Sequence, residues 1–160
     1  MSWVNVFGQN FFKDPITKGR FNYIIGYQNI NPINLEGLNI LELGIARGFR
    51  EVCSGGGMDC LWYSNYHLSS EIIFNNPNPC TGLKLGYTFS FIFLNLGIQI
   101  VDYTNFKQSD FAIRPEIGFT LIGIYEIIYG YNSFLDNNDF QNIGNNTLSL
   151  RWTINSMPNK

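Results

Sequence analysis

Four neighbouring residues carry the side chains best suited to catalysis. His67 and Glu71 could act as an acid and a base, and Ser69 or Ser70 could act as the nucleophile of a lipid-modifying enzyme. The chain has no Gly-x-Ser-x-Gly turn, and His67 is its only histidine. A lone histidine of this kind is more often a hydrogen-bonded interior residue. We therefore expect no catalytic residues and no enzyme activity.

A second candidate is the carboxylate pair Glu116 and Glu126, since two carboxylates can cleave a glycoside. Arg114 and Arg151 fall on the same predicted inner face, so ion pairing is the better interpretation. Both charge signs would then meet in a narrow interior, where ion pairs fix the register of the strands. A proton or ion path is the alternative. The predicted network comprises Glu42, Glu71, Lys84, Arg114, Glu116, Glu126 and Arg151.

Three cysteines could supply thiol chemistry. Cys53 and Cys60 flank a glycine-rich segment that would let them form a disulfide, although two unpaired buried thiols are an equal alternative. A strand over 61–75 would separate Cys60 from Cys80 by roughly 45 Å at ~3.3 Å per residue, so we expect Cys80 to be unpaired. With one histidine and no close Cys/His spacing, we expect neither a metal site nor a cofactor.

The elements that must position these residues show a period of two. From Leu83 to Phe91 every second residue is apolar, and Lys84, Gly86 and Thr88 fall between them. A strand with lipid on one face and a polar lumen on the other changes its surroundings at each residue. The same alternation appears at 21–28, 41–46, 65–74, 94–100, 113–121, 125–132 and 147–154.

About eight such strands predict an all-β fold, an up-and-down antiparallel transmembrane β-barrel with both termini on one side. Pro115 cannot donate to a ladder, which predicts a bulge or a strand end there. Tight turns are expected at Ile92 and at Ile122. The longer connections 30–37, 76–81, 103–110 and 133–145 would lie at the opposite end, while 48–60 would be a long connection at the tight-turn end.

Composition separates the classes of function. The 160 residues fit one domain; charged residues make up only 14% and aromatic residues 16%, which favours lipid as the solvent. No Lys/Arg cluster is present, so nucleic acid is not expected as a partner. No run of 18 apolar residues occurs, which leaves a barrel as the only spanning structure. The aromatic residues expected at the membrane interfaces are Tyr23, Tyr27, Trp62, Tyr66, Tyr125, Tyr129, Tyr131 and Trp152.

Three segments are expected. Residues 1–19 would be a signal-peptide remnant and N-terminal segment, in which 3–8 resemble the tail of a signal cleaved near Gln9. The alternative is that this segment is the true N-terminus. Residues 20–155 would form the barrel, and 156–160 a C-terminal tail.

Five short stretches carry a resemblance to a family: LELGIA at 41–46, GLKLGY at 82–87, RPEIGF at 114–119, YGYN at 129–132 and LSLRW at 148–152. Over 20–155 the chain resembles the small outer-membrane β-barrel proteins of the Bacteroidetes type. The resemblance implies a bacterial outer-membrane location and contact with outer-membrane lipid. It also implies the barrel-assembly machinery as a partner during biogenesis and a larger outer-membrane protein complex as a candidate partner.

Three functions follow as hypotheses. The first is an integral outer-membrane barrel without a large pore, acting as a structural or accessory subunit of an outer-membrane assembly. The second is a soluble lipocalin-like carrier, whose apolar faces would point inward around a hydrophobic ligand. The third is a lipid-modifying membrane enzyme. The polar faces consist mainly of Gly, Ser, Thr and Asn, too few charges for a soluble exterior, which favours the first.

Overall fold

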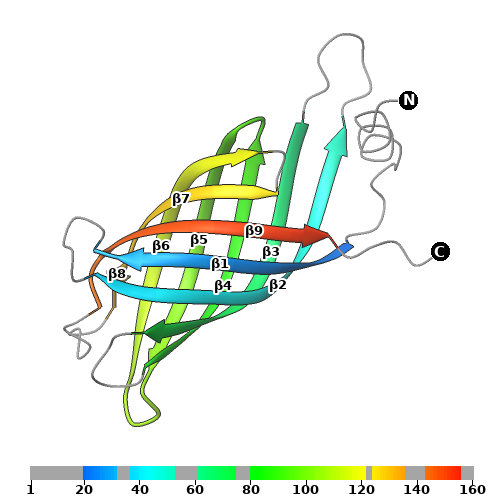
Figure 1. Ribbon diagram of the computed structural model, residues 1–160. Coiled ribbons are helices and arrows are strands. Elements are labelled where there is room, and N and C mark those ends of the chain that lie inside the picture. The colour runs from blue at the N-terminus through cyan, green and yellow to red at the C-terminus, as the bar shows by residue number, and fades with distance from the viewer. Residues whose placement is uncertain are drawn as a thin grey trace.

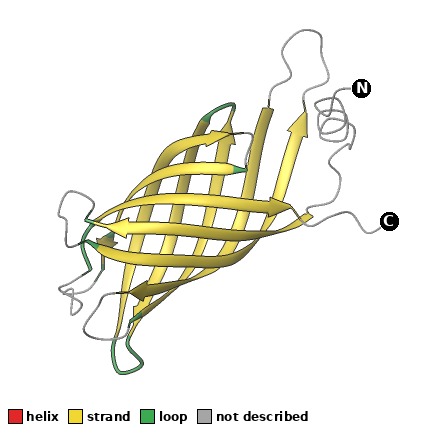
Figure 2. Cartoon of the chain, viewed as in Figure 1, coloured by secondary structure: helices red, strands yellow, loops and turns green. Residues whose placement is uncertain are grey.

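The computed structural model describes residues 20–31, 37–52, 61–74, 80–121, 124–135 and 143–155. All regular structure in these ranges is β-strand (Figure 2). None of these residues belongs to a helix long and apolar enough to cross a membrane. The strands are β1 (Arg20–Ile30), β2 (Leu38–Val52), β3 (Leu61–Phe74), β4 (Thr81–Phe91), β5 (Leu94–Thr104), β6 (Ser109–Leu121), β7 (Tyr125–Tyr131), β8 (Ser133–Phe134) and β9 (Asn146–Asn155).

The strands close into a ring of antiparallel neighbours (Figure 1). Each strand from β1 to β6 pairs with the next along the chain, β7 pairs with β9, and β9 pairs with β1. The two-residue β8 pairs with β6, as β7 does, so β7 and β8 occupy one position in the wall. The fold is therefore an eight-stranded up-and-down antiparallel barrel, as the alternation predicted.

The barrel has two distinguishable ends. β4 and β5 are joined by the two-residue turn Ile92–Phe93 at the end where β1 begins and β9 ends, which we call the turn end. β5 and β6 are joined by 105–108 at the opposite end, the loop end. The tight turn predicted at Ile92 is confirmed, and the one predicted at 122–123 lies outside the described residues, as do 1–19 and 156–160.

Outward and inward faces alternate as the sequence predicted. On β4 the outward Leu83 and Leu85 are 56% and 58% exposed, whereas Lys84 between them is fully buried. On the other strands, too, large apolar side chains cover the outside, and most inward side chains are polar or charged. Ile24 and Ile128 are inward exceptions, and more apolar residues gather inside the loop end.

The prediction of a bulge or strand end at Pro115 is wrong, because β6 runs through it. Glu116 pairs with Gly130 of β7, and Ile113 pairs with Ser133 of β8. The two pairs lie three positions apart on β6 and three apart on the opposite side, so no residue is inserted and the register does not shift. Proline lacks the N–H that a ladder needs. Its effect is limited to the interruption that divides β7 from β8.

Two predicted connections were too long. β5 continues to Thr104 and β6 begins at Ser109, so Tyr103 and Asp110 belong to strands and are buried, leaving 105–108 as the connection. β2 likewise continues to Val52, where a connection from residue 48 was expected. Strand pairing overrode the turn-forming composition of these ends, since each added pair satisfies backbone groups on both strands.

Candidate functional site in the barrel interior

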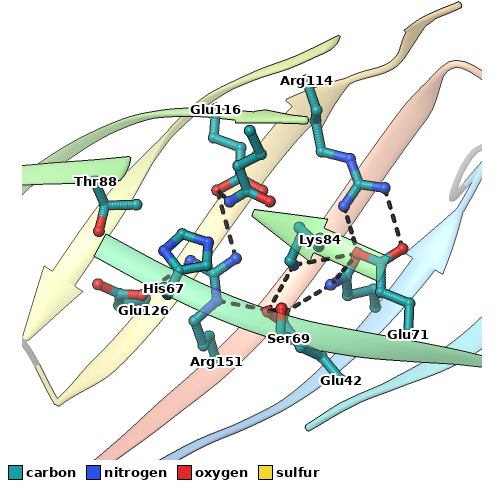
Figure 3. A network of polar contacts seen from close by, with 12 residues as sticks. Glu42, His67, Ser69, Glu71, Lys84, Thr88, Arg114, Glu116, Glu126 and Arg151 are labelled. Carbon is teal, nitrogen blue, oxygen red and sulfur yellow. Dashed lines mark hydrogen bonds and ion pairs between the residues drawn. The ribbon is translucent and has the colours of Figure 1, made fainter. Parts of the chain in front are cut away.

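The interior charge network draws on six strands. Glu42 comes from β2, Glu71 from β3, Lys84 from β4 and Glu126 from β7. β6 contributes two of the residues and β9 one; these are Arg114, Glu116 and Arg151. All seven residues expected from the sequence point into the lumen, each less than 5% exposed, and the structure brings them together (Figure 3).

The part of the network nearer the loop end is centred on Glu71. Arg114 Nη1 lies 2.7 Å from Glu71 Oε1, and Nη2 donates to Oε2 at 3.3 Å, so the guanidinium grips both carboxylate oxygens. Lys84 Nζ lies 3.1 Å from Glu71 Oε1 and 2.6 Å from Glu42 Oε1. Gln28 Nε2 donates to both acids, at 2.8 Å to Glu42 and 3.1 Å to Glu71. Two carboxylates here face two cations.

The part nearer the turn end depends on Arg151. Its guanidinium reaches three carboxylates, at 3.3 Å to Glu42 Oε2, 3.4 Å to Glu116 Oε2 and 3.4 Å to Glu126 Oε2. Two amides assist: Gln99 Nε2 donates to Glu116 Oε2, and Asn95 Nδ2 donates to Glu126 Oε1 at 2.7 Å. Cations are therefore scarcer than carboxylates in this part.

Inward glycines make room for the long side chains. Gly26 is the register partner of both Glu42 and Arg151, and a Cβ there would lie 3.1 Å from Glu42 Oε2. Gly130 is the register partner of Glu116, and its Cβ would lie 3.0 Å from Arg114 Cδ. Small barrels commonly fill their interior by alternating small and large residues. The glycines thus allow seven charged side chains to share one lumen.

An apolar cluster occupies the interior at the loop end. It gathers the loop-end residues of several strands around Tyr103, which is fully buried, together with Ile143 from the segment before β9. Its buried members are Ile30, Leu38, Ile40, Ile73, Cys80, Val101, Tyr103, Ala112 and Ile143, with Phe134 packed against them. This cluster lies between the charge network and the loop end, beside the buried polar residues Asp110, Asn132 and Thr147.

Three of the candidate catalytic side chains make hydrogen bonds or ion pairs within the barrel interior. Ser69 Oγ donates to Glu42 Oε1 at 2.8 Å, and His67 Nδ1 lies 3.3 Å from Asn65 Oδ1. Glu71 is gripped by Arg114 as described above. Ser70 faces outward on β3 with partial exposure. These contacts are those of a polar interior and do not align a nucleophile with a base.

The carboxylates Glu116 and Glu126 share the guanidinium of Arg151, as ion pairing requires. Cys80 is an unpaired buried thiol, as expected, whereas Cys53 and Cys60 lie outside the described residues. Among the described residues, no group of three or more His, Cys, Asp or Glu side chains could hold a metal ion.

Sequence reasoning missed one member of the interior and the partners of two others. Tyr103 was assigned to a connection, yet it is hydrogen-bonded to Arg114 and donates to Glu71 Oε2 at 3.3 Å. The alternation put Gln28 and Asn132 on the polar face but did not predict that both accept hydrogen bonds from Arg114. The inward phase of Gln99 and Val101 extends to Tyr103 in steps of two, which is the signal that could have found it.

A scan against family models and searches of curated proteins and of solved structures found no match to this chain.

Proposed function

We propose that this chain is an integral β-barrel of the bacterial outer membrane and serves as a structural or accessory subunit of an outer-membrane assembly, without a large pore. The observation that carries the proposal is the arrangement of its two faces. On β5 the outward Ile98 and Ile100 are 56% and 52% exposed, while the inward Gln99 is 1% exposed. Water would penalise such an exterior, whereas lipid would solvate it.

The aromatic residues near the two ends support this proposal. At the loop end the hydroxyls of Tyr27 and Tyr129 donate to Asn39 and Asn146, each at 2.5 Å. Towards the turn end the rings of Tyr125 and Trp152 are stacked, with their centroids 5.9 Å apart. Rings with an apolar body and a polar tip suit a membrane interface. The side chain of Trp62 lies outside the described residues.

The position of Arg47 also fits a membrane. It is the one Lys or Arg side chain described on the outward face of the strands, and its guanidinium carbon lies 5.7 Å from the centroid of the Phe21 ring. Both residues are close to the turn end, where a long basic side chain can reach lipid headgroups. Outward charges are tolerated near an interface and costly at the middle of the bilayer.

The filled interior supports a structural role over conduction. The charge network fills the middle of the lumen, and the apolar cluster occupies its loop end. An eight-stranded barrel is only wide enough for its own side chains. We further propose outer-membrane lipid as the surroundings, the barrel-assembly machinery as the partner in biogenesis, and a larger outer-membrane protein complex as the working partner. The resemblance of the five stretches to Bacteroidetes-type barrels points to the same location.

The alternative is a soluble lipocalin-like carrier. The apolar cluster around Tyr103 and Ile143 favours it, since this is the part of the interior where a hydrophobic ligand could be held. The charges in the rest of the lumen favour it less, because a lipid chain would have to displace paired side chains. A lipid-modifying enzyme has weaker support still, and we propose no enzyme activity.

Membrane fractionation followed by gel electrophoresis tests the proposal. The full chain should be found in the outer-membrane pellet, need detergent for extraction, and migrate differently before and after boiling, because a closed membrane barrel resists unfolding by the gel detergent. A protein that stays in detergent-free buffer would overturn the membrane proposal and favour the carrier. The location then distinguishes these two functions before any ligand is known.

A further inference from the structure

The seven-residue charge network is short of one positive charge. It contains four carboxylates, Glu42, Glu71, Glu116 and Glu126, and three cations, Lys84, Arg114 and Arg151. With all seven ionised, the difference is one negative charge in a lumen from which water is largely excluded. An unbalanced charge in such surroundings is strongly unfavourable, and a buried carboxylate commonly avoids the cost of its desolvation by taking up a proton.

The shortage is located in the part nearer the turn end. Glu71 is paired with both Arg114 and Lys84, and Lys84 also pairs with Glu42. Glu116 and Glu126 have only Arg151 as a cationic partner, at 3.4 Å from each, and Arg151 also contacts Glu42. Two carboxylates therefore share one guanidinium that a third carboxylate also uses.

Of the four carboxylate oxygens of Glu116 and Glu126, one has no hydrogen-bond or ion-pair partner among the described residues. Both oxygens of Glu126 are engaged, Oε1 by Asn95 and Oε2 by Arg151. Glu116 Oε2 is engaged by Gln99 and Arg151, whereas Glu116 Oε1 is buried and has no hydrogen-bond partner among the described residues. A bare buried carboxylate oxygen is costly when ionised and becomes a donor when protonated.

The two amides near the pair donate to other oxygens. Asn95 Nδ2 donates to Glu126 Oε1, and Gln99 Nε2 donates to Glu116 Oε2. Gln99 also interacts with His67. Neither amide therefore supplies a donor to Glu116 Oε1, which stays bare while the carboxylate is ionised.

We propose that Glu116 and Glu126 hold one proton between them at neutral pH and so form a proton-binding site in the lumen. Arg151 faces the pair from β9 and Glu42 from β2. Tyr63 of β3 interacts with Glu126, His67 of β3 lies beside Gln99 and Arg151, and Arg114 lies two residues before Glu116 on β6. The proton brings the network to three negative and three positive charges. This inference does not depend on whether the barrel lies in a membrane.

The test is the stability of the full folded chain between about pH 6 and pH 10, in detergent or in plain buffer if none is needed. The folded wild-type protein would bind a proton that the unfolded chain has released, so its stability should fall as the pH rises. The unfolding equilibrium constant should increase by up to about tenfold per pH unit while the folded chain still holds the proton, and this dependence should end once the site has lost it. Glu116→Gln, a neutral mimic of the protonated acid, should be more stable than the wild type at neutral pH, because it folds without taking up a proton, and should lack this pH dependence.

Glu71→Gln is the matched control, because the same substitution removes a carboxylate that already has two cations. It should be less stable than the wild type at neutral pH, the opposite of the effect expected for Glu116→Gln, because it deprives Arg114 and Lys84 of their shared anion. If this variant does not fold, the infrared carbonyl band of a protonated carboxylic acid provides a second readout. The band should be present in the wild type at neutral pH and absent from Glu116→Gln.

Three results would overturn the proposal. The first is a Glu116→Gln variant with the same pH dependence as the wild type. The second is a Glu116→Gln variant that loses stability at neutral pH, since that would mean an ionised Glu116. The third is a wild-type stability that rises with Na⁺ at fixed pH and ionic strength, with the effect lost in Glu116→Gln, because a metal ion would then supply the missing charge.

Discussion

Arg114 and Glu71 are 43 residues apart in the chain, yet they meet inside the barrel in a two-point contact, with Arg114 Nη1 2.7 Å from Glu71 Oε1. β4 and β5 separate their strands in the wall, so the contact crosses the lumen. It ties together parts of the wall that share no ladder.

We expect Glu71→Gln to reduce the free energy of unfolding by about 3–5 kcal/mol, since it leaves Arg114 buried without its anion. The urea midpoint of the folded barrel measures this loss. The double variant Glu71→Gln/Arg114→Met should lose less than the sum of the two single variants, because the two side chains interact directly. Additive losses would show that the contact contributes little.

Charge placed on the outward face tests the surroundings of the barrel. Leu85→Arg, in the middle of β4, should cost about 2–4 kcal/mol in a lipid bilayer, whereas Phe91→Arg at the turn end should cost about 0–1 kcal/mol. Folding yields in vesicles give the comparison. Equal and small costs at both positions would indicate an exterior that faces water.

Two glycines allow a test of the interior packing. A Cβ at Gly118 would lie 2.2 Å from Ile127 O and 2.8 Å from Ile128 Cα, both backbone atoms that cannot rotate away. Gly118→Ala should therefore cost about 3 kcal/mol or prevent closure. At Gly97 the nearest atom is Thr88 Cγ2 at 3.0 Å, on a side chain that can rotate, so Gly97→Ala should cost less. The fraction that migrates as closed barrel on unboiled gels reports both.

The turn between β4 and β5 contains a strained residue. Ile92 has a φ of 56°, a left-handed conformation that is unfavourable for a β-branched side chain. Ile92→Gly should stabilise the barrel by about 1 kcal/mol, measured by the denaturant midpoint. Phe93→Gly, at the neighbouring position without a positive φ, should bring no gain, and equal gains from both would contradict this explanation.

Cys80 precedes β4 and packs into the apolar cluster. Burial raises the pKa of its thiol to about 11. In a chain with Cys53→Ser and Cys60→Ser, Cys80 should react slowly with a thiol reagent at pH 8 while folded, because little thiolate is present and access is blocked. The rate should rise sharply in denaturant; fast reaction of the folded protein would mean that this end of the barrel opens.

The sequence alone predicted whether nearly every strand side chain points into the barrel or outward, because a period of two assigns each residue of a strand to one face. It could not identify the neighbours across strands. The pairing of Gly26 with both Glu42 and Arg151 depends on register, which connections of unknown length determine. Tyr103 was missed for a related reason: the polar residues that follow it suggested an earlier end to β5 than pairing with β6 allows.

The opposition of inward glycines and long charged side chains has a consequence for strand register. If one strand slid by a single residue, its acids and bases would turn to the outer surface and its apolar residues would turn inward. The same slip would place large side chains where a glycine now leaves space. Each wrong pairing is thus penalised twice, so the filling of the lumen itself selects the native register when the barrel closes.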